Sequence, residues 1–242
     1  MDTVTRNKTI KLIGMNEADI RTSISDLIDN EDVKIEIKPF DAKTYIILSA
    51  DADTEEAAKD LIKPVSKEIK RRFGKYIYST KEKITLEMSV VNLLEKNELT
   101  ISTAESCTGG LLAVRLINVP GVSDVYKEGF ITYTNKAKRK TLGVNKSTLK
   151  KYGAVSEQTA KEMAVGAALA ADTDISISVT GIAGPDGGTN EKPVGLVYVG
   201  VCIKDIVHVE EFRFSGDRAN VREQTVISAL GLLRKCILEH FS

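Results

Sequence analysis

From Thr85 to the end of the chain, strand-type segments alternate with helix-type segments, and this alternation restricts the fold more than any other feature. Strand patterns fall at Leu99–Ala104, Gly129–Thr134, Ile175–Thr180, Leu196–Ile203 and Val207–Phe214. Helix patterns begin at Thr85 and recur at about Gly109–Asn118, Asn135–Leu142, Lys146–Tyr152, Ser156–Ala170 and Ala219–Phe241. Because the last two strands are close enough to pair as a hairpin, residues 85–242 are predicted to form a layered α/β/α domain with a mixed sheet.

The preceding residues, 1–80, predict a separate small β-α-β-β-α domain with two helices on one face of its sheet. The expected elements are a strand at Lys8–Ile13, a helix at Asn16–Asp29, strands at Val33–Lys38 and Thr44–Ser49 joined by a turn at Asp41–Lys43, and a helix from Asp53 or Thr54 to Phe73. Pro64 is expected to kink that last helix or to start its second half. The charged stretch Ser79–Lys83 predicts the boundary between the two domains.

Composition argues against several classes of protein. The chain has 34 basic and 34 acidic side chains, so no global field favours nucleic acid. It has two histidines and three widely spaced cysteines, which argues against a zinc site, a Ser–His–Asp triad or a disulfide framework. No segment approaches ~20 consecutive apolar residues. The composition therefore predicts a soluble, cytoplasmic protein with no membrane partner.

The first segment whose side chains could take part in catalysis or binding is Thr103–Gly110, which lies between a predicted strand and a predicted helix. Ser106 could be held there as a nucleophile, and the N–H groups of Thr108, Gly109 and Gly110 could hold an oxyanion or a phosphate. The alternative is that Ser106 or Thr108 only caps the helix. Cys107 is a rival nucleophile, but its side chain should point away from that of Ser106.

The second segment is Tyr133–Lys138, where a strand ends and a helix begins. Arg139 and Lys140 extend its basic run, and most runs of this kind are solvated helix faces. Since the chain has no suitable histidine, however, a serine nucleophile needs another base. Burial can lower the pKa of a lysine from ~10.4 towards neutrality, which makes Lys138 a candidate base.

The third segment, Thr180–Gly195, is a long Gly/Pro-rich loop after a buried-type strand, where α/β sheets place ligand-binding loops. Such a loop can also be a mobile surface connection. Further along, Arg218 could bind a phosphate or pair with Asp217. His208 lies at an alternating strand position and is expected to be structural.

Taken together, the segments TAESCTGG, YTNKAKRKTLGV, GAVSEQTA, TGIAGPDGGTNEKPVG and FSGDR closely resemble the CinA C-terminal domain family, whose members are nicotinamide mononucleotide deamidases, also called nicotinamide-nucleotide amidases. The resemblance covers about Leu86 to Phe241. The preceding part resembles the small KH-type domain of full-length CinA proteins. The molybdopterin-binding-like domain that normally comes first is absent from this sequence, so the ADP-ribose pyrophosphatase activity associated with it is not expected.

The resemblance implies hydrolysis of the carboxamide of nicotinamide mononucleotide to nicotinic acid mononucleotide and ammonia, with no metal or redox cofactor. By position, the family's catalytic serine falls on Ser106, and its Tyr-x-Asn-x-x-Lys element falls on Tyr133, Asn135 and Lys138. Ser106 would attack the amide carbon, and Lys138 would take its proton and return it to the departing ammonia.

The secondary roles at this site stay open. Tyr133 or Thr180 could position the lysine. N–H groups near Thr108–Gly110 or Gly181 could hold the oxyanion or the phosphate. Asn135 and Arg218 are further candidates for binding the nucleotide substrate.

Two other classes of function stay open as well. The same loops could bind a nucleotide without turnover, in a regulatory or scaffold protein. The small domain could bind nucleic acid through Lys67, Lys70, Arg71, Arg72 and Lys75. A KH domain needs a GXXG loop, however, and the nearest candidate, Gly14–Glu17, has one glycine and an acid, so specific nucleic-acid binding is not expected. The alanine-rich helix around Ala160, Ala164, Ala167, Ala168 and Ala171 would permit close packing in a homo-oligomer, a dimer or larger.

Overall fold

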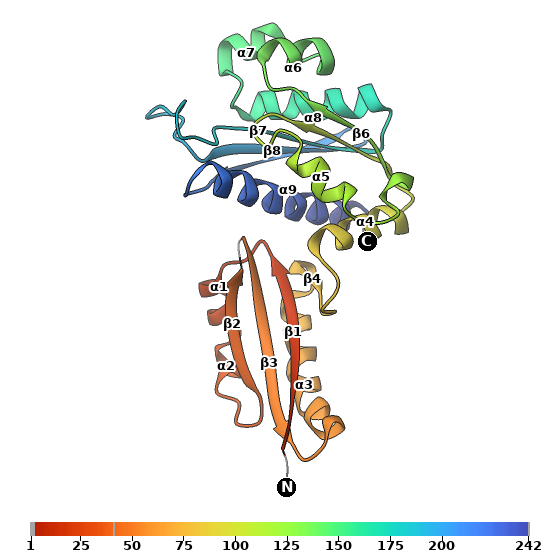
Figure 1. Ribbon diagram of the computed structural model, residues 1–242, viewed down its shortest axis with the longest axis vertical. Helices are drawn as coiled ribbons and strands as arrows, with labels where there is room; N and C mark the ends of the chain where they lie inside the picture. The colour runs from red at the N-terminus through yellow and green to blue at the C-terminus, as the bar shows by residue number, and fades with distance from the viewer. Residues whose placement is uncertain (1–2, 41, 242) are drawn as a thin grey trace. The chain divides into compact units, whose positions relative to one another are not determined.

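The computed structural model describes residues 3–40 and 42–241, and it divides into two compact units, of which the first ends at Leu86 and the second begins at Glu87 (Figure 1). Asp41, part of the predicted turn, lies outside the described residues. Among the described residues, no helix is long and apolar enough to cross a lipid bilayer.

The first unit is a four-stranded antiparallel sheet in the order β2-β3-β1-β4, with its helices packed on the sheet. Its elements are β1 (Val4–Ile13), α1 (Glu17–Ser23), α2 (Ser25–Ile28), β2 (Lys34–Phe40), β3 (Lys43–Ala52), α3 (Glu55–Phe73), the short 3-10 helix η1 (Gly74–Tyr76) and β4 (Ile77–Ser79). Alternate residues of β1 and β3 face the helices, so Ile10, Leu12 and Ile46 are wholly buried in one core.

Three details of this unit differ from the sequence prediction. The helix predicted at Asn16–Asp29 is interrupted at Ile24, because the Ser23 carbonyl accepts a 2.7 Å hydrogen bond from Arg72 and the chain turns there into α2. Helix α3 continues through Pro64 as one helix of 19 residues. Strand β4 was not predicted, since three residues are too short to show a strand pattern.

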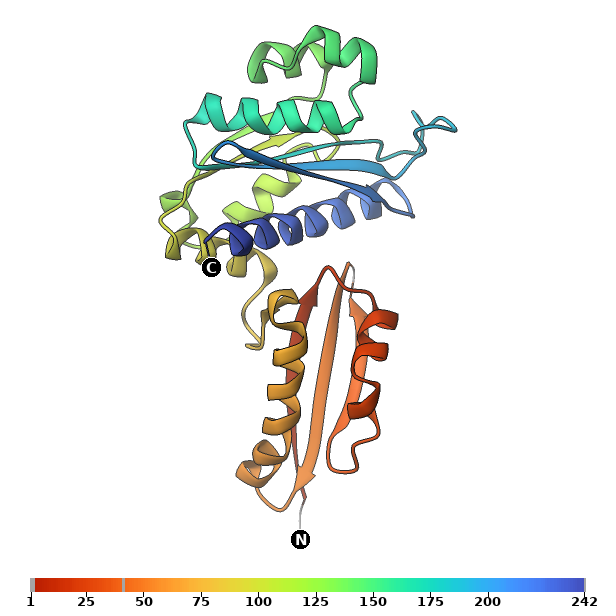
Figure 2. The same ribbon diagram turned by 180° about the vertical axis from the view of Figure 1, so that it is seen from behind.

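The second unit contains the mixed five-stranded sheet that the sequence predicted, in the order β6-β5-β7-β8-β9. Strand β5 pairs in parallel with β6 and β7, whereas β7, β8 and β9 pair antiparallel. Helix α8 covers one face, and α5 and α9 lie on the other (Figures 1 and 2). Helices α6 and α7 pack on the outside of α8. The architecture is therefore α/β/α with an added helical pair.

The elements of this unit are α4 (Leu86–Lys96), β5 (Ile101–Glu105), α5 (Leu111–Ile117), the 3-10 helix η2 (Val122–Asp124), β6 (Tyr126–Ile131), α6 (Asn135–Leu142), α7 (Lys146–Tyr152), α8 (Glu157–Ala171), β7 (Ile175–Gly181), β8 (Leu196–Ile203), β9 (Ile206–Arg213) and α9 (Arg218–Phe241). Strand β6 ends three residues earlier than predicted, because the Thr134 hydroxyl caps α6 and accepts from Ala137 N at 3.1 Å. Helix α5 begins after the two glycines of Thr103–Gly110, which both have positive φ.

The alanine row of α8 faces the sheet of its own chain. Ala160, Ala164 and Ala167 are wholly buried. Their small side chains let β7 approach so closely that Ser176 and Ser178 donate hydroxyl hydrogen bonds to the carbonyls of Ala164 and Ala160. These alanines are therefore not the surface on which a partner would pack, and the homo-oligomer stays a prediction without their support.

Candidate active site

Ser106 lies at the carboxyl end of β5, in the turn that leads to α5. Its backbone N–H continues the sheet by donating to Val179 O of β7 at 3.0 Å, which fixes the serine in the edge formed by the ends of the parallel strands. The side chain is only 8% exposed. In open α/β sheets this edge is where ligands bind, so the position suits a nucleophile.

Lys138 reaches Ser106 from the first half of α6. Its Nζ lies 2.8 Å from Ser106 Oγ and donates at 2.7 Å to the Thr132 carbonyl, just beyond the end of β6. The Thr132 N–H in turn donates to Glu105 O at 2.8 Å. The amine is thus held between the serine and a backbone carbonyl that is itself tied to β5.

The packing of α6 on α8 explains why this lysine is buried. Lys138 and Leu142 are the buried residues of α6, one turn apart on the face that meets α8. The two helices approach so closely that a Cβ at Gly166 would stand 2.0 Å from Leu142 O. Lys138 is consequently 0% exposed, although three cations surround it in the sequence.

Burial lowers the pKa of Lys138 from 10.5 to about 8. An ammonium group loses hydration in this position, and only one hydroxyl and one carbonyl replace the water. Lys136, Arg139 and Lys140 lie close to Lys138 in the sequence, and repulsion from these cations could also lower its pKa. These three side chains are exposed to solvent, and they do not contribute to the lowered pKa. Desolvation is the cause.

Glu105 is the residue that the sequence argument missed in this turn. Its carboxylate is 1% exposed and accepts from the N–H groups of Gly110, Leu112 and Ala113 at 2.9, 3.1 and 2.8 Å. Glu105 therefore caps α5, in place of the Ser106 or Thr108 cap that the sequence suggested. A cap of this kind cannot be predicted from a short sequence motif, because the carboxylate accepts from N–H groups five to eight residues further along the chain.

The rest of the turn is held by its own hydrogen bonds and by α9. Gly109 N donates to Ser106 O at 3.2 Å, so the N–H groups of Gly109 and Gly110 both have acceptors within the turn. Arg222 of α9, which is 114 residues further along the chain, donates a 2.6 Å hydrogen bond to Thr108 O. The Thr108 hydroxyl is buried and has no hydrogen-bond partner among the described residues, which leaves it free for a substrate.

None of the other predicted site residues accepts a hydrogen bond from Lys138 Nζ among the described residues. Tyr133 is 59% exposed, and its hydroxyl accepts from Arg218 at 3.3 Å. Arg218 also donates to Gly184 O at 2.8 Å, so it joins the segment before α6 to the Gly/Pro-rich loop. The Thr180 hydroxyl donates to Ala154 O at 2.7 Å, and Asn135 is exposed as the first residue of α6.

Neither Tyr133 nor Thr180 therefore positions the lysine, because the Thr132 carbonyl does so. Asp217 caps α9 by accepting from Asn220 N and does not pair with Arg218. Gly181 ends β7, beside Thr180. A Cβ at this glycine would stand 2.8 Å from Leu196 O, so β8 leaves no room for a side chain there.

Two other side chains with possible chemistry have different roles here. Burial raises the pKa of Cys107 to about 11, so its thiol stays protonated at neutral pH and is a poor nucleophile. His208 faces His240, with their Nε2 atoms 3.5 Å apart. Within residues 3–40 and 42–241, no group of three or more His, Cys, Asp or Glu side chains could hold a metal ion.

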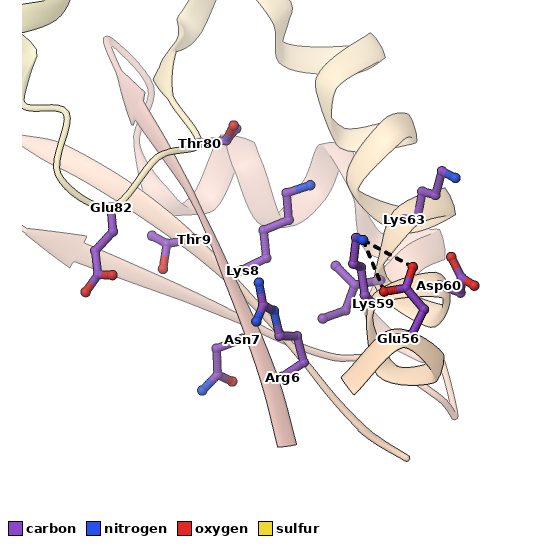
Figure 3. Close-up of a pocket in the computed structure, with 11 residues that line it drawn as sticks. Arg6, Asn7, Lys8, Thr9, Glu56, Lys59, Asp60, Lys63, Thr80 and Glu82 are labelled. Atoms are coloured by element: carbon purple, nitrogen blue, oxygen red, sulfur yellow. Dashed lines mark hydrogen bonds and ion pairs between the residues drawn. The ribbon is translucent and has the colours of Figure 1, made fainter. Parts of the chain in front are cut away.

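In the first unit, a hollow of about 620 Å³ lies between β1 and α3 (Figure 3). Arg6 and Lys8 of β1 line it together with Lys59 and Lys63 of α3, but Glu56, Asp60 and Glu82 line the same hollow. Lys59 pairs with Glu56, as the dashed lines show. Because the charges are mixed, the hollow resembles no phosphate-binding surface, and the absence of specific nucleic-acid binding stays the prediction for this unit.

The fold and the site define an α/β protein whose larger unit holds a serine and a buried lysine in contact at the ends of parallel strands. Two family descriptions match the chain. Residues 7–79 match the "Damage-inducible protein CinA KH domain", and residues 83–237 match the "CinA C-terminal domain". The chain therefore belongs to the CinA family.

Similar proteins support this membership. A CinA-like protein of Kosmotoga olearia is 48% identical over 234 residues, which are 96% of this chain and 56% of that protein. A relative in Clostridium novyi is 50% identical over 97% of this chain and 56% of its own length. The chain thus spans just over half the length of these curated relatives.

Solved structures of CinA proteins are also similar to this chain. The competence/damage inducible protein CihA from Agrobacterium tumefaciens is 45% identical, with a TM-score of 0.60 over 61% of this chain and 91% of that chain. A CinA superfamily protein from Escherichia coli is 39% identical, with a TM-score of 0.59 over 64% of this chain and 93% of that chain.

Proposed function

We propose that this protein is an amidase that converts nicotinamide mononucleotide and water into nicotinic acid mononucleotide and ammonia. The observation that carries the proposal is the 2.8 Å contact between Ser106 Oγ and the Nζ of a wholly buried lysine with a lowered pKa. The choice of substrate rests on the resemblance to the CinA C-terminal domain. The chemistry of a serine–lysine pair rests on the geometry.

In the first half of the reaction, neutral Lys138 accepts the hydroxyl proton of Ser106 while Oγ attacks the carboxamide carbon. A tetrahedral intermediate forms with negative charge on the former carbonyl oxygen. The intermediate then breaks its C–N bond. The ammonium of Lys138 returns the proton to the leaving nitrogen, so that ammonia departs and an ester links Ser106 to the nicotinoyl group.

In the second half, water attacks the ester carbon and passes a proton to Lys138. The ester C–O bond breaks, Oγ recovers a proton from the lysine, and the carboxylic acid leaves and ionises. The Thr132 carbonyl accepts from Nζ and so helps to aim the lone pair of the neutral amine at Ser106. The pair returns to its starting protonation state after each turnover.

The hydrogen bonds of the turn indicate which N–H groups are available to form the proposed oxyanion hole. Gly109 N and Gly110 N already donate within the turn. The N–H groups of Cys107 and Thr108 directly follow the nucleophile, and neither donates to any other described residue. We assign the stabilisation of the oxyanion to these two groups.

The test is to incubate the purified chain with nicotinamide mononucleotide and to measure ammonia and the acid product together. Equal amounts of the two products are expected, and the Ser106→Ala variant controls for contaminating amidases. The Cys107→Ala variant should stay active, because its thiol is not the nucleophile. Saturable binding of the nucleotide with no ammonia released would contradict the proposal and favour the non-catalytic nucleotide-binding class.

We expect the activity to resist chelation. The proposed chemistry uses an amine and a hydroxyl, and the described residues offer no cluster of metal ligands. Turnover should be the same with and without excess EDTA after prolonged dialysis. Loss of turnover that a divalent metal restores would show that the serine–lysine scheme is wrong.

We also expect a chain that begins at Ile84 to fold and to turn over substrate by itself. Ser106, Lys138, Tyr133 and Arg218 all lie in the second unit, which has its own core. Circular dichroism should give a cooperative thermal transition, and the kcat should be close to that of the full chain. A folded but inactive product would mean that the first unit contributes to the site or to a required oligomer.

A further inference from the structure

The helical pair α6–α7 carries an unbalanced charge in a chain that is neutral overall. Residues 135–152 include seven lysines or arginines and no aspartate or glutamate, whereas the whole chain has 34 of each sign. Lys138 is buried at the candidate active site, so the other six cations are exposed. Glu162 of α8, a carboxylate that is hydrogen-bonded to this helical pair, accepts from Asn145 N and from the Thr148 hydroxyl.

Four of these cations line one hollow of about 490 Å³ at the junction of the two helices. Lys136, Arg139 and Lys140 come from α6, spaced so that they share one side of the helix, and Lys146 comes from the start of α7. The remaining lining residues, Gly143, Val144 and Asn145, bring no charge. Gly143 has a φ of 69°, a left-handed turn that lets α7 begin immediately after α6.

None of the four side chains forms a hydrogen bond or an ion pair with another described residue. The hollow of the first unit is different, since carboxylates of Glu56, Asp60 and Glu82 stand among its cations (Figure 3). Like charges one helical turn apart destabilise a helix, and among the described residues no carboxylate forms an ion pair with any of these four cations. The four unpaired cations could therefore bind several negative charges at once.

We infer that this hollow binds a polyphosphate group, meaning two or more phosphates joined in a chain. Four cations at one place match the charge of such a chain, whereas a single phosphate or carboxylate would leave most of them unpaired. Arg139 can bind a phosphate with two parallel hydrogen bonds, and the lysines act as point charges. The phosphates can come from a nucleotide or from an inorganic polyphosphate.

The hollow is distinct from the candidate active site. Lys138 points to Ser106 from the buried face of α6, whereas Lys136, Arg139 and Lys140 are exposed to solvent. Binding in the hollow requires neither Ser106 nor the proposed amidase activity. Anion binding in the hollow could therefore be disproved while the amidase activity is confirmed, and the amidase activity could be disproved while anion binding is confirmed.

The experiment is isothermal titration of the full chain with inorganic tripolyphosphate at ~0.15 M salt, where long-range attraction is largely screened. The double variant Arg139→Gln/Lys146→Gln removes two charges from the hollow. Lys150→Gln/Lys151→Gln removes two charges from the same helical pair outside the hollow, and it is the matched control. Circular dichroism verifies that both variants are folded. Orthophosphate, ATP and a single-stranded oligonucleotide are titrated in parallel.

We expect tripolyphosphate to bind at one site per chain and more tightly than orthophosphate. The hollow variant should weaken binding by about tenfold or more, because charge-assisted hydrogen bonds are lost. The control variant should weaken it by less than about twofold. Binding of ATP with the same loss in the hollow variant would identify a nucleotide source, and its absence would identify inorganic polyphosphate.

Three results would overturn the inference. The first is no binding of tripolyphosphate at millimolar concentration. The second is an equal loss of affinity in the two variants, which would mean that only the diffuse field of the helices attracts anions. The third is tighter binding of the oligonucleotide with equal losses in the two variants, which would indicate an extended nucleic-acid surface.

Discussion

Replacing Lys138 by arginine should abolish amide hydrolysis as completely as replacing it by alanine, with a loss of about a hundredfold to ten-thousandfold in kcat. Lys138 Nζ contacts Ser106 Oγ at 2.8 Å, and its pKa of about 8 gives a useful fraction of neutral amine near neutral pH. A guanidinium keeps the positive charge but cannot accept the serine proton in this range. The measurement is kcat and KM for wild type and both variants.

The same lysine sets the expected pH dependence of wild-type turnover. Only the neutral amine is active, so the rate should rise about tenfold per pH unit below about pH 8 and level off above it. Lys136→Ala is the control, because this exposed lysine should leave the pH profile unchanged. Near-normal kcat in Lys138→Arg would contradict the prediction. Lys138 would then be a charge contact and not the base.

The lowered pKa of Lys138 also predicts a cost in stability. Between pH 8 and 10.5 the unfolded chain keeps a proton that folded Lys138 has lost, so the free energy of unfolding should rise with pH in this window. The slope is at most about 1.4 kcal/mol per pH unit. Lys138→Met should lack this contribution, which urea unfolding of both proteins at several pH values can measure.

Of the substitutions considered, removal of the Glu105 carboxylate should lower the free energy of unfolding most. Glu105→Ala leaves the N–H groups of Gly110, Leu112 and Ala113, buried or half-buried, without their acceptor and removes a negative charge from the start of α5. We expect a loss of about 3–5 kcal/mol in the free energy of unfolding. Glu105→Gln should also destabilise, because its amide nitrogen would face a backbone donor.

Urea unfolding measures this effect, and Glu128→Gln on exposed β6 is the control. Turnover at low temperature, where the variants are still folded, separates two roles for Glu105. If it only positions the turn, the loss of activity should follow the loss of stability. A Glu105→Gln protein with normal stability and no turnover would contradict this prediction and would assign the carboxylate a direct part in the chemistry.

The sequence alone predicted most of the elements of this protein and the pair of residues that we propose to react. Regular apolar spacing identified the strands of the mixed sheet, and strand β8 has the predicted limits, Leu196–Ile203. Because neither of the two histidines suited the role of base, lysine was the predicted base, and Lys138 contacts Ser106. These inferences succeed because periodicity and residue chemistry are local properties, written within one element or one short motif.

The tertiary structure decided the environment in which these residues act. The capping of α5 by Glu105, the support of Thr108 by Arg222 and the contact of Tyr133 with Arg218 join parts of the chain with no common spacing rule. The pKa of Lys138 depends on the burial that follows when α6 packs on α8 across Gly166. Desolvation and hydrogen-bond partnership are set by what packs against a group, and only the folded chain brings those neighbours together.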